Sequence, residues 1–437
     1  MGIPNYDVII VGARCAGATL ATYLARAGAS VLLLDKDKQP SDQILSTHTI
    51  HPPGIDVLDE VGVGEPIRSK SPATRMMRLR KNEGVIDVPF AEGRAEYCPR
   101  RKRLDGLLQE AAVQAGAEFL DRTRVSGLLW DSGRVVGVQA VQRDHERVFS
   151  ARLVVGADGR RSTVASLVNA TEYLGYDAPR AMYWAYWDAP DFWRTDPAYG
   201  VGMYLGRLGA VIRVVFQTDD NLILIGSLTP LDKASSWRSD PLDCLTRDLI
   251  QDPFIRPIVE GSRPEGHVRG TVRERYFFRT GAGLGWALVG DAGHHKDFVL
   301  GDGITEALLQ ARELAHAISS GVEKSLYQWW RARDVKAIPL FFFGQDEAAL
   351  TPVPELVSLA LSRAADDESL KARFAQMLDH RLSPYEVFQP GKVLKWALSG
   401  ALRGKPKLLA EFQRMGRRIS QVNREVKLRK ALAAKEA

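Results

Sequence analysis

Three short segments of the chain carry glycines and carboxylates at positions that suit a phosphate-bearing ligand. The first, residues 12–17 (Gly-Ala-Arg-Cys-Ala-Gly), follows an apolar run and leads into a stretch of small residues that ends at Ala27. Asp35 closes a second apolar run about twenty residues downstream. A strand, glycine turn, helix and strand in this order place a pyrophosphate on a helix N-terminus and a carboxylate on a ribose hydroxyl. The segment therefore predicts a dinucleotide site.

The residues inside this turn refine the prediction. Arg14 stands where the usual G-x-G-x-x-G pattern has its second glycine, which lets the backbone approach the phosphates. An arginine at that place either meets a phosphate oxygen directly or points to solvent. Cys15 is predicted to be a small packing residue and not a redox centre. Cys15, Ala16, Gly17 and the later Lys36 are predicted to border the same ligand.

Two later segments each end an apolar strand with a glycine and an acid, and a glycine-rich helix start follows the second. Their functional candidates are Asp158 and Gly159, Gly290 and Asp291, and Gly301, Gly303 and Ile304. A helix N-terminus carries partial positive charge and therefore favours an anionic group. The later helix start is thus a second predicted site for negative charge.

In this order and spacing, the segments resemble the FAD-binding segments of the para-hydroxybenzoate hydroxylase-type (group A) flavin monooxygenases, which are related to geranylgeranyl reductase-like and flavin halogenase proteins. The resemblance covers about residues 5–335. It implies non-covalent FAD, with Asp291 on the ribityl chain, Ile304 in a helix aimed at the flavin pyrimidine ring, and Arg101 facing the cofactor. The full predicted FAD set is Gly12, Arg14, Cys15, Ala16, Gly17, Asp35, Lys36, Arg101, Asp158, Gly159, Gly290, Asp291, Gly301, Gly303 and Ile304.

The chain departs from that family at two positions beside the expected flavin. Phe298 and Asp302 stand where the family usually carries proline and glutamine. Negative charge develops on the flavin when it is reduced, so an unpaired carboxylate nearby would oppose reduction. Asp302 must therefore point away from the flavin or be held by a cation.

The predicted fold class is α/β (α+β overall), a Rossmann-like FAD-binding domain with an inserted antiparallel-sheet substrate domain and a helical C-terminal region. Pro339, Pro352 and Pro384 are expected to punctuate the C-terminal helices. The expected boundaries are residues 1–72, 98–175 and 276–335 for the FAD-binding domain, 73–97 and 176–275 for the substrate domain, and 336–437 for the helical region with its basic tail.

The resemblance implies an FAD-dependent monooxygenase. NADPH or NADH would reduce the flavin, O2 would give a C4a-hydroperoxide, and one oxygen atom would pass to a small apolar aromatic or alkene substrate. The chain shows no second Rossmann unit, which fits transient nicotinamide binding or a separate reductase. A geranylgeranyl reductase-like flavoprotein, which saturates prenyl double bonds, is the alternative enzyme. A halogenase is less favoured because the W-x-W-x-I-P motif is absent, and a non-catalytic flavin-binding protein is the alternative from another class.

Aromatic residues are concentrated early in the inserted strands, where six of the eleven residues 183–193 are Tyr, Trp or Phe. Side chains alternate along a strand, so Tyr183 and Trp187 share one face and Trp184 and Tyr186 share the other. One face is expected to border the flavin cavity and the other to pack as core. The sequence leaves open which face does which.

Two residues are candidates for catalysis. His48 follows the second predicted strand, in the region that passes beside the isoalloxazine ring in the resembled family. A histidine there either relays protons near pH 7 or is structural. Tyr183 offers a hydroxyl that could orient a phenol or carbonyl. No Cys or His spacing predicts a metal site.

Composition agrees with a globular protein that has a large core. The apolar fraction of 45% and the charged fraction of 26% are ordinary values for such a protein. The three cysteines are scattered, which favours a reducing cytoplasm over a disulfide framework. A cytoplasmic location is therefore expected.

The net charge of +6 belongs to the C-terminal tail. Residues 401–437 contain eleven Lys or Arg and three Glu, which leaves the preceding residues slightly acidic. Segments 408–415 and 426–432 predict amphipathic helices with basic faces. They either cap the body of the protein or make a weak contact with a membrane surface that brings the enzyme to a lipophilic substrate. Nucleic-acid binding is not expected, because no known module accompanies the charge.

Overall fold

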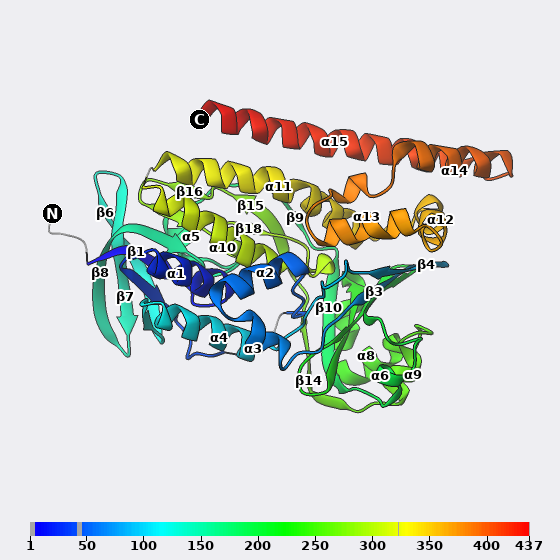
Figure 1. Cartoon of the computed structure of the whole chain (residues 1–437), viewed down its shortest axis with the longest axis horizontal. Coiled ribbons are helices and arrows are strands. Elements are labelled where there is room, and N and C mark those ends of the chain that lie inside the picture. Colours follow the sequence, from blue (N-terminus) through cyan, green and yellow to red (C-terminus); the bar gives the residue numbers. More distant parts are fainter. Residues whose placement is uncertain (1–4, 42–45, 322, 437) are drawn as a thin grey trace.

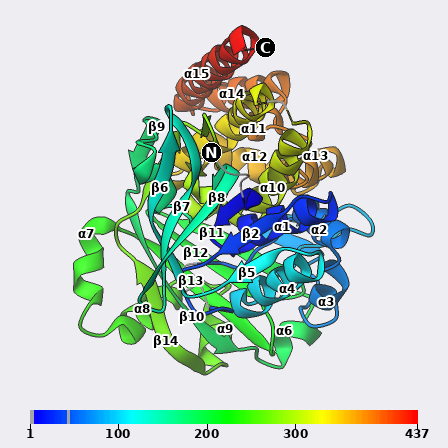
Figure 2. The same cartoon turned by 90° about the vertical axis from the view of Figure 1, so that its left-hand side faces the viewer.

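The computed structural model describes residues 5–41, 46–321 and 323–436. Figures 1 and 2 show a sheet with its helices at one end of the molecule, a second sheet at the other end, and C-terminal helices along one edge.

The first sheet has eight strands, and its central strand, β1 (Tyr6–Val11), is apolar and buried over its last four residues. They are β1 (Tyr6–Val11), β2 (Val31–Leu34), β5 (Glu118–Leu120), β6 (Thr123–Asp131), β7 (Arg134–Gln142), β8 (His145–Gly156), β16 (Ala282–Gly283) and β17 (Trp286–Leu288). The order is β16-β17-β8-β1-β2-β5, with the β6–β7 hairpin attached through β8. Val8 and Ile10 pack on one side with the helices, and Ile9 and Val11 pack on the other with the hairpin. Both faces of β1 are therefore core.

Helices cover this sheet and follow the predicted strand, turn, helix and strand unit. They are α1 (Cys15–Arg26), α2 (Pro52–Val61), α3 (Gly64–Arg68), α4 (Arg101–Gln114), α5 (Thr163–Leu167) and α10 (Gly303–Ser319). α1 leaves the turn after β1 and packs against both α4 and α10. The Rossmann-like arrangement predicted from the sequence is confirmed.

The second sheet joins two separate parts of the chain. Its seven strands are β3 (Met76–Lys81), β4 (Gly84–Pro89), β10 (Arg180–Asp188), β11 (Gly202–Leu208), β12 (Val211–Gln217), β13 (Leu222–Pro230) and β14 (Pro264–Thr271). The pairings are antiparallel except that of β3 with β11, which is parallel, with Met77 opposite Met203. The sheet is thus mixed and not wholly antiparallel as expected, because β3 joins its edge from an earlier pass of the chain.

Short helices cover the outer face of the second sheet, and a small third sheet connects it to the first. The helices are α6 (Phe192–Thr195), α7 (Leu231–Ala234), η1 (Ser235–Trp237), α8 (Pro241–Leu249) and α9 (Arg256–Glu260). The third sheet contains β9 (Glu172–Asp177), β15 (Arg275–Arg279) and β18 (His294–His295), and the turns η2 (Gly290–Ala292) and η3 (Phe298–Leu300) flank β18.

The C-terminal region is helical, as predicted, but its helices are longer than expected. They are α11 (Lys324–Ala348), α12 (Glu355–Ala364), α13 (Glu368–Leu378), η4 (Pro384–Glu386), α14 (Pro390–Leu402) and α15 (Lys407–Glu436). Pro339 lies inside α11 without ending it, because Ile338 and Phe341 are buried beside it and offset the lost hydrogen bond. The two predicted tail helices form one helix, α15, which Gly416 does not interrupt. Among the described residues, no helix combines the length and apolarity needed to cross a bilayer.

Candidate active site

The predicted segments meet at one cavity of about 380 Å³. It lies beyond the carboxyl ends of the parallel strands β1, β8 and β17, where open α/β sheets bind their ligands. Every member of the predicted FAD set lines this cavity except Gly17. A Cβ on Gly17 would lie 1.8 Å from the carbonyl oxygen of Gly12, so Gly17 lets the helix pack closely on the turn.

Two helices begin at the cavity with uncapped N-termini. Neither N-cap residue, Arg14 for α1 or Asp302 for α10, gives its helix a side-chain hydrogen bond. The first N–H groups of both helices can therefore receive negatively charged groups. Gly12 has φ 105°, and a Cβ there would lie 2.4 Å from the carbonyl oxygen of Ala157, whereas a Cβ on Gly303 would meet nothing within 4 Å. The tight turn at Gly12 fits the pyrophosphate of a dinucleotide, and the open space at Gly303 fits its ring.

Arg14 shows a third arrangement, different from the two considered from the sequence. Its Nη2 donates to Asp37 Oδ2 and to Ser41 Oγ, each at 3.2 Å, while the residue still lines the cavity. The carboxylate of Asp35 accepts hydrogen bonds from the N–H groups of Ala13 at 2.8 Å and Asp37 at 2.9 Å. Asp35 thus orders the phosphate turn in addition to bordering the cavity.

A buried ion pair fixes Arg101 at the cavity wall. Its Nη2 donates to Asp105 Oδ1 at 2.9 Å, and Cys15 Sγ donates to the same oxygen at 3.3 Å. Burial raises the pKa of the Cys15 thiol to about 12, so the thiol stays protonated near neutral pH. The packing role predicted for Cys15 agrees with this geometry. Asp105, which the sequence did not single out, is the residue that orients Arg101.

The Asp158 carboxylate accepts hydrogen bonds at the start of α5, next to the N-cap residue Ser162, and is not free. Its Oδ1 accepts from Ser162 Oγ at 2.5 Å, and its Oδ2 accepts from the Thr163 N–H at 2.6 Å. Burial raises the pKa of Asp158. Gly159 has φ 78°, and a Cβ there would meet nothing within 4 Å. This segment therefore shapes the cavity wall through its backbone.

Asp291 lines the cavity, and its carboxylate is paired with His295. Although protein surrounds Asp291 on most sides, 41% of its side chain is exposed, and its Oδ2 lies 3.3 Å from His295 Nδ1. His295 Nε2 lies 3.8 Å from Glu274 Oε2. Burial alone would lower the pKa of His295, but Asp291 and Glu274 raise it to about 9. The imidazole therefore carries a positive charge near neutral pH. Glu274 has no motif of its own in the sequence.

We expect this charged histidine to make stability depend on pH. The folded pKa of about 9 lies above the ordinary value of 6.5, so the stabilisation is complete below pH 6.5 and is lost as pH rises through 9. Such a shift corresponds to about 3 kcal/mol. His295→Asn should therefore lower the free energy of unfolding more at pH 6 than at pH 10, which chemical denaturation at both pH values will measure. If His295→Asn lowers the free energy of unfolding by the same amount at both pH values, His295 is not charged in the folded protein.

Asp302 is held by Lys296 and His380 at the start of α10. Its Oδ2 is ion-paired with Lys296 Nζ, and its Oδ1 lies 2.8 Å from His380 Nε2. Lys296 Nζ also lies 3.1 Å from Glu306 Oε1. Burial would raise the pKa of Asp302, but Lys296 and His380 hold it far below its usual range. Of the two arrangements expected for Asp302, the structure therefore shows the one held by a cation.

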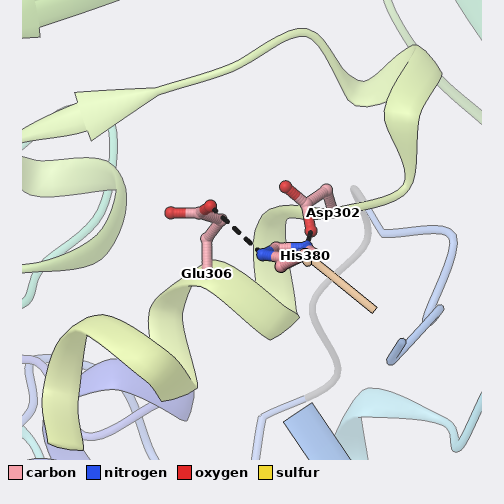
Figure 3. A group of neighbouring side chains, drawn as sticks. All are labelled: Asp302, Glu306 and His380. Carbon is pink, nitrogen blue, oxygen red and sulfur yellow. Dashed lines mark hydrogen bonds and ion pairs between the residues drawn. The ribbon is translucent and has the colours of Figure 1, made fainter. Parts of the chain in front are cut away.

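Asp302 belongs to a cluster of side chains of the kind that can coordinate a metal ion. Figure 3 shows Asp302, Glu306 and His380 converging, and their ligand atoms all lie within 4.8 Å of one another. Lys296 already pairs with both carboxylates, so among the described residues the negative charge is balanced by an ammonium. His380 follows α13 and is 78 positions from Asp302, so no local spacing could have predicted this cluster.

Asp297 and Phe298 line the cavity beside this network. Asp297 Oδ2 accepts a hydrogen bond from the Tyr176 hydroxyl at 3.2 Å. Burial raises the pKa of Asp297 to about 7, so this carboxyl group is partly protonated near neutral pH. The sequence singled out Phe298 only as a departure from the family pattern and did not identify the acid next to it.

β10 directs its aromatic residues to two faces, as alternation requires. On one face the Tyr186 hydroxyl lies 2.6 Å from His48 Nε2, and Trp184 meets the His48 ring edge-on at 6.1 Å between centroids. On the opposite face the Tyr183 hydroxyl donates to the carbonyl oxygen of Ala234 at 3.1 Å. Tyr183 thus points into the helical cover and away from the cavity, so the geometry does not support the catalytic role expected for it.

His48 is buried between the cavity and the aromatic face of β10. Thr47 and Thr49 line the cavity, whereas His48 itself is 1% exposed and has φ 65°. Burial, together with nearby arginines that include Arg101, lowers the pKa of His48 to about 3. The neutral imidazole can accept a hydrogen bond from Tyr186 at Nε2. A left-handed backbone at a non-glycine residue is strained, and such strain is common at functional sites.

The sequence matches the FAD binding domain family over residues 5–323, which is most of the chain. The chain belongs to this family. FAD is therefore its cofactor, and the protein is an FAD-dependent oxidoreductase, as the cavity geometry and the sequence both predict.

Relatives of this FAD-binding protein include enzymes of several kinds. The "Probable electron transfer flavoprotein-quinone oxidoreductase YdiS" of Escherichia coli (strain K12) is 31% identical over 298 residues, 60% of this chain and 63% of the relative. The digeranylgeranylglycerophospholipid reductase of Methanocella arvoryzae is 28% identical over 351 residues, 76% of this chain and 80% of the relative. The p-nitrophenol 4-monooxygenase PnpA from Pseudomonas putida DLL-E4 has a TM-score of 0.71 at 17% identity, over 87% of this chain and 98% of that one. The predicted resemblance and fold class are confirmed.

Proposed function

We propose that the protein is a monooxygenase that inserts one oxygen atom from O2 into a small apolar aromatic or alkene substrate, with NADPH or NADH as a transient reductant. The observation that supports this most directly is the His48–Tyr186 pair beside the FAD cavity. The pair places a hydroxyl and a neutral base next to an aromatic wall. Such a combination suits an apolar ring that carries an ionisable hydroxyl.

Residues of the cavity would hold FAD, which supplies the electron-transfer and oxygen chemistry when it is bound. The N-terminus of α1 would bind the pyrophosphate, and Asp291 would accept a hydrogen bond from the ribityl chain. The N-terminus of α10 would face the pyrimidine ring. Lys296 would keep the charge of Asp302 balanced, so that this carboxylate does not oppose negative charge on the ring.

On the substrate side, Tyr186 would orient the ring, and His48 would hold the Tyr186 hydroxyl in place by accepting its hydrogen bond. The guanidinium of Arg100 lies 4.9 Å from the centroid of the Tyr186 ring and packs against it. Both His48 and Tyr186 are buried, so bulk water does not compete for their hydrogen bond.

Two substitutions test this role. Tyr186→Phe and His48→Asn are each expected to lower kcat by about 100-fold or more, because each breaks the His48–Tyr186 hydrogen bond that positions the Tyr186 hydroxyl. FAD content should stay at the wild-type level. Tyr183→Phe is the matched control, because it removes a similar hydroxyl from the opposite face, at a cost of about 1 kcal/mol in stability. Equal loss of turnover in Tyr183→Phe and Tyr186→Phe would contradict the assignment.

A second candidate function is the reduction of prenyl double bonds. The 28% identity to a digeranylgeranylglycerophospholipid reductase over 76% of this chain favours it. In that case the aromatic wall of β10 would contact an isoprenoid chain, and the His48–Tyr186 pair would deliver a proton to a reduced alkene carbon.

Product masses separate these functions. The purified protein, loaded with FAD, is incubated with NADPH and a panel of phenols and isoprenoids, with and without O2. We expect a gain of one oxygen atom that requires O2. A gain of two hydrogen atoms without O2 would establish the reductase, and a halogen atom gained in the presence of halide would establish a halogenase. If no substrate is consumed with any reductant, the protein binds flavin without catalysing a reaction.

A further inference from the structure

α14 presents an apolar stripe to solvent. Leu394, Leu398 and Leu402 recur every four residues, and they are 38%, 47% and 90% exposed. The other side of the helix buries Val393 and Ala397 in a cluster with residues of α12 and α15. Most of the Leu402 side chain and about half of the Leu398 side chain are therefore left in solvent by the packing of α14 against the protein.

Lys and Arg residues lie near this stripe along the chain. Residues 391–410 contain five Lys or Arg and no Asp or Glu, and three of the five pair with acids of neighbouring elements: Lys392 with Asp367, and Lys405 and Lys407 with Glu355. Further along α15, Arg414, Arg417 and Arg424 are exposed, whereas Val422 of the same helix is buried in a cluster with residues of α11. Figures 1 and 2 show α14 and α15 together along one edge of the molecule. Both helices lie outside the residues that match the FAD-binding family.

We propose that α14 and α15 form a docking surface for an anionic lipid bilayer. The leucines of α14 would enter the boundary between headgroups and acyl chains, and the exposed arginines of α15 would meet lipid phosphates. Charge complementarity selects an anionic partner. The leucines favour a lipid surface over a nucleic acid, because apolar side chains gain free energy in acyl chains and none against a sugar-phosphate backbone. This surface is separate from the proposed reaction and does not depend on it.

Sedimentation with vesicles tests the proposal on the full-length, FAD-loaded protein. We expect it to sediment with phosphatidylcholine–phosphatidylglycerol vesicles and not with phosphatidylcholine alone, and to be released by added salt. The double variant Leu398→Ser/Leu402→Ser should bind about tenfold more weakly or worse. The triple variant Arg414→Glu/Arg417→Glu/Arg424→Glu should bind at least about 100-fold more weakly.

Matched variants on the first sheet serve as controls. Leu284→Ser changes a leucine that is 49% exposed near β16 and β17. The triple variant Arg122→Glu/Arg143→Glu/Arg152→Glu changes the net charge by the same amount at exposed positions elsewhere. Both controls should bind vesicles as the wild type does.

Three results would overturn the proposal. Wild-type protein that stays in the supernatant has no such surface. Equal loss of binding in the two triple variants would show attraction by net charge alone, without a defined surface. A wild-type dimer that Leu398→Ser/Leu402→Ser converts to a monomer in analytical ultracentrifugation would assign the leucines to a contact between two copies of the chain.

Discussion

Lys296→Met is expected to lower the free energy of unfolding by about 3–5 kcal/mol. Lys296 is ion-paired with Asp302 and Glu306, and the side chains of Lys296 and Asp302 are each only 4% exposed. Without the ammonium, the carboxylates of Asp302 and Glu306 face each other in the interior and lose the cation that pairs with both. Chemical denaturation at pH 7, with FAD in excess, will measure the loss.

Two companion variants separate charge from packing. Lys336→Met removes an exposed ion pair with Glu313, so it should change stability by less than about 1 kcal/mol. The double variant Lys296→Met/Asp302→Asn should recover part of the loss, because it also removes the uncompensated carboxylate. If the double variant is no more stable than Lys296→Met, the lysine acts through packing and not through its charge.

Asp291→Ala should weaken FAD binding about ten- to hundredfold. In the role proposed for Asp291, the substitution would remove a charge-assisted hydrogen bond to the ribityl chain, worth ~1.5–3 kcal/mol. Fluorescence titration of the apoprotein with FAD gives the affinity. Asp177→Ala is the control, because the Asp177 side chain is 80% exposed and pairs only at the surface with Arg275. If Asp291→Ala leaves the FAD affinity unchanged, the ribityl chain lies elsewhere in the cavity.

The features of this protein that could be predicted from its sequence are those that depend on residues close together along the chain. β1, the turn at Gly12 and α1 follow one another directly, and an apolar run that must turn at a glycine needs no distant partner to be recognised. The same holds for Asp291, which ends a buried strand. These local patterns gave the FAD cavity and the class of fold.

The rest of the site depends on contacts between distant parts of the chain. His380 reaches Asp302 only because α13 ends beside α10, and no spacing in the sequence encodes that contact. Alternation along β10 separated Tyr183 from Tyr186 but could not say which face meets the flavin domain. That choice is made by the helices that cover the Tyr183 side. The exposure of Leu398 likewise follows from which side of α14 its neighbours cover.

The strand order of the first sheet also has a consequence for synthesis of the protein. Val8 pairs opposite Leu153, and Val154 in turn pairs opposite Trp286, so neighbouring strands are far apart along the chain. Contacts this distant slow folding and leave apolar strands exposed to aggregation in the meantime. A nascent chain cannot complete the cavity until the ribosome has passed Gln310, the last residue along the chain that lines it. The cofactor can therefore stabilise only a nearly finished domain.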